Sequence, residues 1–327
     1  ALSIFRGIYR MSQKWKDKLL SSSFPLEFEA MKELSKDGFS VSSEFAYSRL
    51  DGDTRKDFSV DIDALCFTPF ESEDDVTGSV HLLVECKYRK NGTKWLFLPD
   101  PNEPDYSPFI LGHTIRAIDS FSSDVLPPNC VVPFDEKEGL EFCFKGVEVD
   151  TVNASAHDGQ IRHGLSQLQY ALPPLLTHSI MFGSDIPFFI CPILLTNAPL
   201  FVANKDFSMA SVQESNEIEN MAKEVPYLVT YQDVSPDFTQ HCVSEFNSNF
   251  KYSFEDLESI GALRLSEGEY EHKLPIPLVK SLTSGELSTL KGYFTQFIVC
   301  NWDHFPTLVS DIKATISMAM ETVETDT

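Results

Sequence analysis

Apolar and polar positions alternate in two neighbouring segments of the first third of the chain. Residues 57–68, DFSVDIDALCFT, carry apolar side chains on one side of an extended backbone and mostly acidic ones on the other. Residues 79–89, SVHLLVECKYR, form a second β-like run in which Glu85 and Lys87 share one face. The polar stretch PFESEDDVTG separates the two runs. We therefore expect these segments to pair as an antiparallel hairpin.

The register of this hairpin decides which acidic side chains meet. If the hairpin is centred near residue 74, Asp63 lies opposite Glu85 and Asp61 lies opposite Lys87. Three carboxylates and one ammonium group then converge on one side of two adjacent strands.

The flanking segments predict a small α/β unit. Helical spacing predicts a helix over 25–36, and alternation predicts a strand over 39–47. Apolar residues at 4-3-4-3 spacing predict a helix over 158–176, and the proline-interrupted apolar stretch 186–203 predicts two buried strands rather than a membrane span. The order of helix, three strands, helix and strand is typical of an α/β fold.

The rest of the chain divides by composition. Residues 99–156 are rich in proline and acidic residues, and we interpret them as an insertion in a core that spans residues 1–205. Residues 206–327 predict a mainly helical, acidic C-terminal region. Its expected helices cover 211–224, 255–263, 284–299 and 308–323, with one strand over 226–231.

Charge argues against a surface that attracts phosphate everywhere. The chain has 26 basic and 49 acidic residues, a net charge of -23. The imbalance is small at the N-terminal end, because residues 1–96 hold 14 basic and 16 acidic side chains. Seven cysteines without a CxxC pair, and no continuous apolar core of a signal peptide, lead us to expect a cytoplasmic protein.

The acidic hairpin predicts a metal site. Two neighbouring carboxylates repel each other unless a cation neutralises them, and an all-oxygen site suits Mg²⁺ or Mn²⁺. Asp63 and Glu85 are the expected ligands, and the backbone carbonyl of Cys86 could complete the shell. Lys87 is expected to orient a metal-bound water and to stabilise charge on a phosphate. The sequence contains no GxSxG, P-loop, HExxH or Rossmann glycine motif.

Asp63 in VDIDAL and Glu85-Cys86-Lys87 in LLVECKYR match a known pattern, an acidic residue on one strand and E-x-K on the next. In this the chain resembles the PD-(D/E)XK nuclease superfamily, with its restriction-endonuclease-like αβββαβ core, and most closely the Mrr-like and Holliday-junction-resolvase-like branches. The resemblance covers at most residues 25–195. It implies a metal-dependent nuclease, with Glu29 as a third acidic participant and Gln160 or Gln167 on the following helix.

Each of these residues also has a structural interpretation. Asp61 and Asp63 could be a solvated strand face, Glu29 an exposed helix residue, and either glutamine a solvent-facing side chain. The basic residues after the motif are either phosphate contacts or solubilising charge. They are Arg89, Lys90 and Lys94.

Two functions follow from this sequence. The first is an endonuclease of restriction, defence or repair type that hydrolyses phosphodiester bonds, with DNA as the expected substrate. The second is a nuclease-fold interaction or regulatory subunit without activity, which the net charge favours. A homo-oligomer or a basic protein partner could offset that charge.

Overall fold

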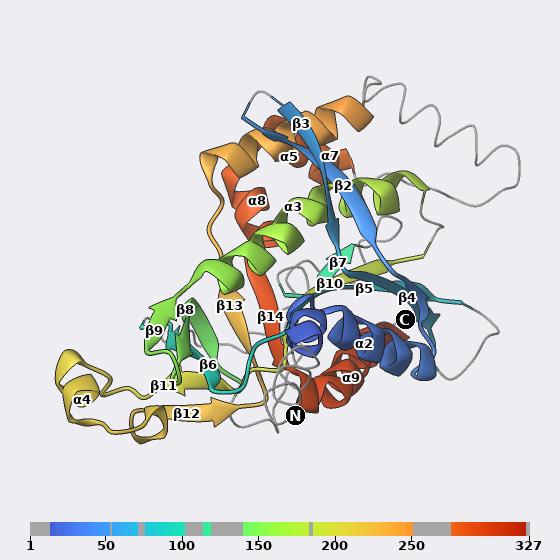
Figure 1. Cartoon of the computed structure of the whole chain (residues 1–327). Helices are drawn as coiled ribbons and strands as arrows, with labels where there is room; N and C mark the ends of the chain where they lie inside the picture. Colours follow the sequence, from blue (N-terminus) through green and yellow to red (C-terminus); the bar gives the residue numbers. More distant parts are fainter. Residues whose placement is uncertain are drawn as a thin grey trace, which may run out of the picture.

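A mixed β-sheet forms the centre of the computed structural model, which describes residues 14–52, 54–70, 76–101, 114–118, 140–182, 186–250 and 276–324 (Figure 1). Twelve strands of the described residues belong to it. The main path runs β1 (Ser40–Ser42), β4 (Ile62–Thr68), β5 (Gly78–Lys87), β10 (Phe188–Thr196), β14 (Gln296–Asn301), β13 (Tyr227–Tyr231), β8 (Phe142–Asp150), β6 (Thr93–Pro99), β11 (Leu200–Ala203) and β12 (Ala222–Val225). In addition, β7 (Arg116–Ile118) pairs with β10 and β9 (Ser155–His157) pairs with β8. The chain is therefore an α/β protein.

Elements of the predicted order are present, but other strands stand between them in the chain, and the predicted strand at 39–47 is divided into β1 and β2 (Phe45–Asp51). Helix α2 (Phe24–Lys36) precedes β1, β4 and β5, which pair antiparallel to one another. Helix α3 (Gly159–Phe182) precedes β10, which runs parallel to β5. All nine residues of β10 are buried, as expected for a strand with both faces covered.

Helices cover the two faces of the sheet separately. One face packs against α2 and α9 (Phe305–Glu324), in a core cluster that includes Leu34, Val84 and Ile312. The other packs against α3, with α5 (Pro236–Asn249), α7 (Ile276–Ser284) and α8 (Leu287–Phe294) in the same cluster. The end of β5 thus lies between two helical layers.

The C-terminal region shares this sheet and its cores. The predicted strand at 226–231 and helix at 308–323 are confirmed as β13 and α9. The predicted helix at 284–299 is wrong in its second half, because α8 ends at Phe294 and the buried run QFIVCN pairs with β10 and β13 as β14. The predicted helix at 211–224 is also wrong. That segment contains the end of α4 (Met209–Glu214), a 3₁₀ turn (Ile218–Asn220) and β12.

The two predicted boundaries fall within the sheet. Residue 205 lies between β11 and β12, which pair antiparallel, so strands on both sides of the boundary belong to one sheet. The interpreted insertion supplies β7, β8 and β9, and β8 joins β6 to β13. The predicted helix at 255–263 lies outside the described residues.

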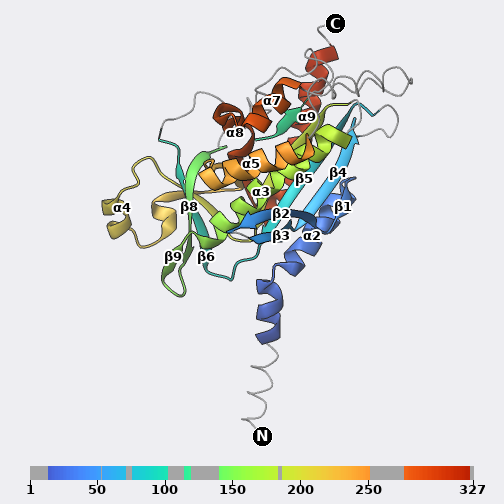
Figure 2. The same cartoon turned by 90° about the horizontal axis from the view of Figure 1, so that it is seen from above.

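The predicted strand at 57–68 is two strands that separate at Asp61. Residues before the break form β3 (Thr54–Val60), which pairs with β2 (Phe45–Asp51) in a separate two-stranded sheet. This hairpin packs against α3 (Figure 2), with the Tyr47 and Val60 side chains in the α3-side core. Residues after the break form β4 of the main sheet. No helix of the described residues is long and apolar enough to cross a bilayer.

Candidate functional site

The β4–β5 hairpin forms in a different register from the predicted one. Ile62 pairs with Val84 and Asp63 with Leu83, so Asp63 is not opposite Glu85. The hairpin closes on the pair Thr68 and Gly78, which shifts the predicted pairing by two residues. A two-residue shift keeps every side chain on its predicted face but changes its partner. The predicted meeting of Asp63 with Glu85 is therefore wrong.

Asp61 takes the place beside Glu85. Its Oδ2 accepts a hydrogen bond from the backbone N–H of Cys86 at 2.7 Å. Asp61 lies between β3 and β4 and belongs to neither strand, so strand pairing does not fix the direction of its side chain. Its carboxylate reaches across to β5. Asp63 instead lies near His81, which is two residues before its pairing partner Leu83 on β5. The distance from Asp63 Oδ1 to His81 Nδ1 is 3.4 Å.

Glu85, Lys87 and Gln167 form a connected group at the end of β5. Glu85 is 1% exposed, and its Oε1 accepts a hydrogen bond from Lys87 Nζ. Lys87 Nζ also donates to Gln167 Oε1 at 3.1 Å, and Gln167 Nε2 donates to the Ser59 carbonyl at 3.1 Å. Gln167 thus links α3 to both the site and the β2–β3 hairpin. Gln160 is exposed at the start of α3, so Gln167 is the glutamine that reaches Lys87.

Gly164 allows α3 to approach the Lys87 side chain. A Cβ at this position would lie 2.5 Å from Leu194 Cδ1 and 3.4 Å from Lys87 Cε. We expect Gly164→Ala to lower the free energy of unfolding by roughly 1–3 kcal/mol, because the fully buried Leu194 side chain or α3 itself must shift to make room for the added methyl group. Gly159→Ala is the control, since a Cβ there meets nothing within 4 Å. Urea denaturation of both variants measures the difference, and equal midpoints would contradict this close packing.

Glu27, rather than Glu29, faces the site from α2. Glu29 is exposed, whereas Glu27 is half-buried and close enough to Asp61 and Lys87 for their charges to shift its pKa. Glu27 lies one helical turn after Ser23, whose Oγ accepts the backbone N–H of Tyr88 at 3.0 Å. The sequence prediction missed Glu27. The four-residue spacing places Glu27 on the same helix face as Ser23, but this points to the site only once Ser23 is known to contact the end of β5.

The environment of Glu27, Asp61 and Glu85 disfavours the ionised form of each side chain, so the pKa of each is raised. Burial, and then the charge of Asp61, raises the pKa of Glu85 to about 8. The same two causes raise the pKa of Glu27 to about 7. Burial also raises the pKa of Asp61, although the Cys86 N–H and Lys87 oppose the shift. A second cation beside Lys87 would relieve this repulsion.

The donor set fits a magnesium-type ion that keeps part of its own hydration. Among the described residues, no group of three or more His, Cys, Asp or Glu side chains is placed so that it could hold a metal ion, so the candidate protein ligands are the two carboxylates of Asp61 and Glu85. Mg²⁺ is commonly bound by one or two carboxylates, with water and substrate phosphate oxygens as the other ligands. Glu85 Oε2 is buried and has no hydrogen-bond partner among the residues that the structure describes, and Asp61 lies beside Glu85. The Cys86 side chain packs into the core on the α2 side, and ligation by its carbonyl stays a prediction.

The three predicted phosphate contacts have different surroundings. Lys94 pairs with Glu219 and lies over the Phe201 ring. Lys90 is exposed. Arg89 is mostly buried and pairs with Glu148.

Comparisons of the chain with protein-family models, curated proteins and solved structures found no match.

Proposed function

We propose that this protein is a metal-dependent nuclease that hydrolyses phosphodiester bonds, with DNA as the expected substrate. The observation that carries the proposal is the buried Glu85 carboxylate, which lies beside Asp61 and Lys87 and has one oxygen without a hydrogen-bond partner in the described part of the chain. Burying several like charges together is costly, and such arrangements concentrate at functional sites. The order α2, β1, β4, β5, α3 and β10 supports a restriction-endonuclease-like core.

The side chains divide the proposed work between them. Asp61 and Glu85 offer carboxylate oxygens to Mg²⁺ or Mn²⁺, and Glu27 adds negative charge from α2. When bound, the ion supplies a water of lowered pKa and neutralises phosphate charge. Lys87 exchanges its contact with Glu85 for the attacking water or a phosphate oxygen, where its positive charge stabilises the developing negative charge. Gln167 keeps the Lys87 ammonium in place throughout.

The alternative is a subunit that binds other macromolecules without cleaving them. The net charge of -23 and the pairing of Arg89 and Lys94 with acidic side chains favour it. The two functions differ in one measurable property, which is turnover that depends on Lys87.

Purified protein should cleave labelled DNA or RNA when Mg²⁺ or Mn²⁺ is present, and EDTA should stop it. We expect Lys87→Ala to lower the cleavage rate by roughly 10²- to 10³-fold, because a charge that stabilises the transition state is removed. Lys223→Ala is the matched control, since Lys223 is an exposed lysine on β12, at the far end of the main sheet path. Denaturing gel electrophoresis over single-stranded, duplex and branched substrates measures the rates. Cleavage that is equal in wild type and Lys87→Ala, or absent with both metals, would contradict the proposal.

A further inference from the structure

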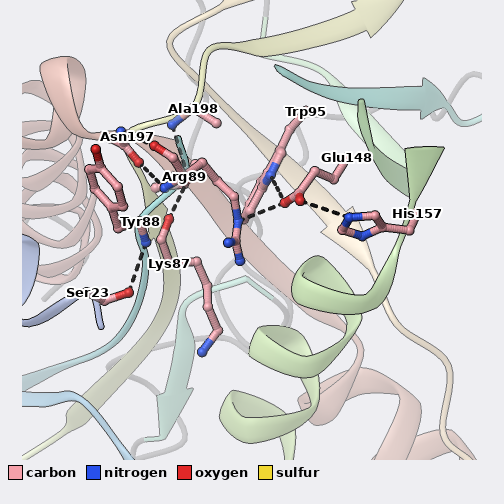
Figure 3. Close-up of polar contacts among 10 residues, drawn as sticks. Ser23, Lys87, Tyr88, Arg89, Trp95, Glu148, His157, Asn197 and Ala198 are labelled. Atoms are coloured by element: carbon pink, nitrogen blue, oxygen red, sulfur yellow. Dashed lines mark hydrogen bonds and ion pairs between the residues drawn. The ribbon is translucent and has the colours of Figure 1, made fainter. Parts of the chain in front are cut away.

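Three side chains from two other segments hold the chain where β5 ends. Thr196 Oγ1 donates to the Lys87 carbonyl at 2.8 Å, and the Tyr88 N–H donates to Ser23 Oγ at 3.0 Å. The Asn197 amide then contacts both sides of Arg89: its Oδ1 accepts the Arg89 N–H at 2.5 Å, and its Nδ2 donates to the Arg89 carbonyl at 2.8 Å (Figure 3). Arg89 therefore has a fixed backbone, although it lies beyond the last ladder pair of β5.

The Arg89 side chain is fixed as well, by a buried carboxylate on β8. Glu148 is 5% exposed, and its Oε2 lies 2.7 Å from Arg89 Nε. The Nε–H is not aligned for a hydrogen bond, so the contact is an ion pair. Trp95 Nε1 donates to Glu148 Oε2 at 3.1 Å, and His157 Nε2 lies 3.3 Å from Glu148 Oε1 (Figure 3). Glu148 is thus itself held in one orientation.

The outer edge of the Arg89 guanidinium remains available. Within the described part of the chain, neither Nη atom has a hydrogen bond or an ion pair, and neither is among the buried atoms that lack a partner. Arg89 follows Lys87, the last residue of β5, by two positions. In Figure 3 the Lys87 and Arg89 side chains extend to the same side of this segment. The free edge therefore lies on the same side as the Lys87 side chain, which contacts Glu85.

We propose that Arg89, oriented by Glu148, binds a backbone phosphate of the nucleic-acid substrate through its two Nη groups. This inference rests on the proposed nuclease function. A guanidinium presents two parallel N–H donors that match two phosphate oxygens, and fixing it beforehand reduces the entropy lost on binding. Lys94 has no comparable free edge, because Glu219 pairs with its ammonium.

The test measures binding without turnover, in a Lys87→Ala background with a fluorescein-labelled DNA oligonucleotide and fluorescence anisotropy. Arg89→Gln should weaken binding by about tenfold and reduce the slope of log affinity against log salt by about one. Arg89→Lys should also weaken binding, because lysine keeps the positive charge but lacks the two parallel N–H donors of the guanidinium. Lys223→Gln is the charge-matched control, an exposed lysine on β12 at the far end of the sheet, and should bind within about twofold of the parent.

Glu148 is a positioning residue in this proposal, so its removal should act only through Arg89. Glu148→Gln should weaken binding by less than Arg89→Gln, and the double variant should bind no more weakly than Arg89→Gln alone. Additive losses would mean that Glu148 supports the fold rather than Arg89, and circular dichroism of each variant checks the fold directly.

The outcomes separate this inference from the function on which it rests. The Arg89 proposal is overturned if Arg89→Gln and Arg89→Lys keep the DNA affinity and salt slope of the Lys87→Ala parent. The nuclease proposal still stands in that case if the wild-type protein cleaves DNA. If the Lys87→Ala parent does not bind nucleic acid and the wild-type protein does not cleave it, both proposals fail. A selective loss in both Arg89 variants, with the Lys223 control unchanged, supports the phosphate contact.

Discussion

Asp61→Asn is expected to lower cleavage by roughly 10²- to 10³-fold, whereas Asp63→Asn should leave most of the activity. The two residues are only two positions apart, and both substitutions remove one negative charge. Only the Asp61 carboxylate lies beside Glu85, through its hydrogen bond with the Cys86 N–H. The Asp63 carboxylate lies near His81 instead. The pair of variants therefore separates the observed register from the predicted one.

Single-turnover cleavage at saturating Mn²⁺ is the suitable measurement, because it excludes effects on product release. Metal titration of each variant should show weakened binding only for Asp61→Asn. If Asp63→Asn is the inactive variant and Asp61→Asn is active, the assignment of Asp61 as a ligand is wrong.

Glu85→Gln is expected to stabilise the metal-free protein at high pH while abolishing activity. The pKa of Glu85 is about 8 in the folded protein, against an ordinary value of 4.5. The folded state therefore holds a proton that the unfolded state has released between about pH 4.5 and 8, so stability falls as pH rises through this window. Glutamine removes the buried charge and most of this dependence. Near pH 9 the variant should be more stable by roughly 1–3 kcal/mol.

A divalent metal should make the wild-type protein more stable than Glu85→Gln, which reverses their order of stability without metal. Mn²⁺ binds the ionised carboxylates of the folded wild type and raises its melting temperature at pH 8, with little effect on Glu85→Gln. Thermal unfolding from pH 5 to 9, with Mn²⁺ and with EDTA, measures both effects. Parallel curves for the two proteins at every pH would show that Glu85 carries no unfavourable buried charge.

Side-chain alternation is sufficient to predict that Glu85 and Lys87 share one face of a strand, but it predicts neither the hairpin register nor the strand break at Asp61. The runs at 57–68 and 79–89 place Glu85 and Lys87 on one face, and this is confirmed by the Lys87 contact with Glu85. The two-residue shift between Asp63 and Asp61 depends on where the hairpin closes, and a two-residue period cannot detect it. The strand break at Asp61 is equally invisible, because residues 57–60 alternate in the same phase as residues 62–65.

Other features depend on tertiary contacts that no local pattern encodes. The run QFIVCN continues a plausible helical period, yet it becomes β14 because it completes the sheet between β10 and β13. Glu27 and Glu29 are both acidic residues of α2, and only the packing of α2 against the end of β5 distinguishes them. Glu148 is more than 50 residues from Arg89 in sequence, and pairing of β6 with β8 brings it near.

The most direct test of the metal site is a crystal structure of the protein soaked with Mn²⁺ and recorded with anomalous scattering. The account predicts one ion bound to oxygens of Asp61 and Glu85 at about 2.0–2.3 Å, with the Lys87 ammonium moved away from Glu85 but still near Gln167. An ion bound between Asp63 and His81, or an undisturbed Lys87–Glu85 pair at saturating Mn²⁺, would contradict it.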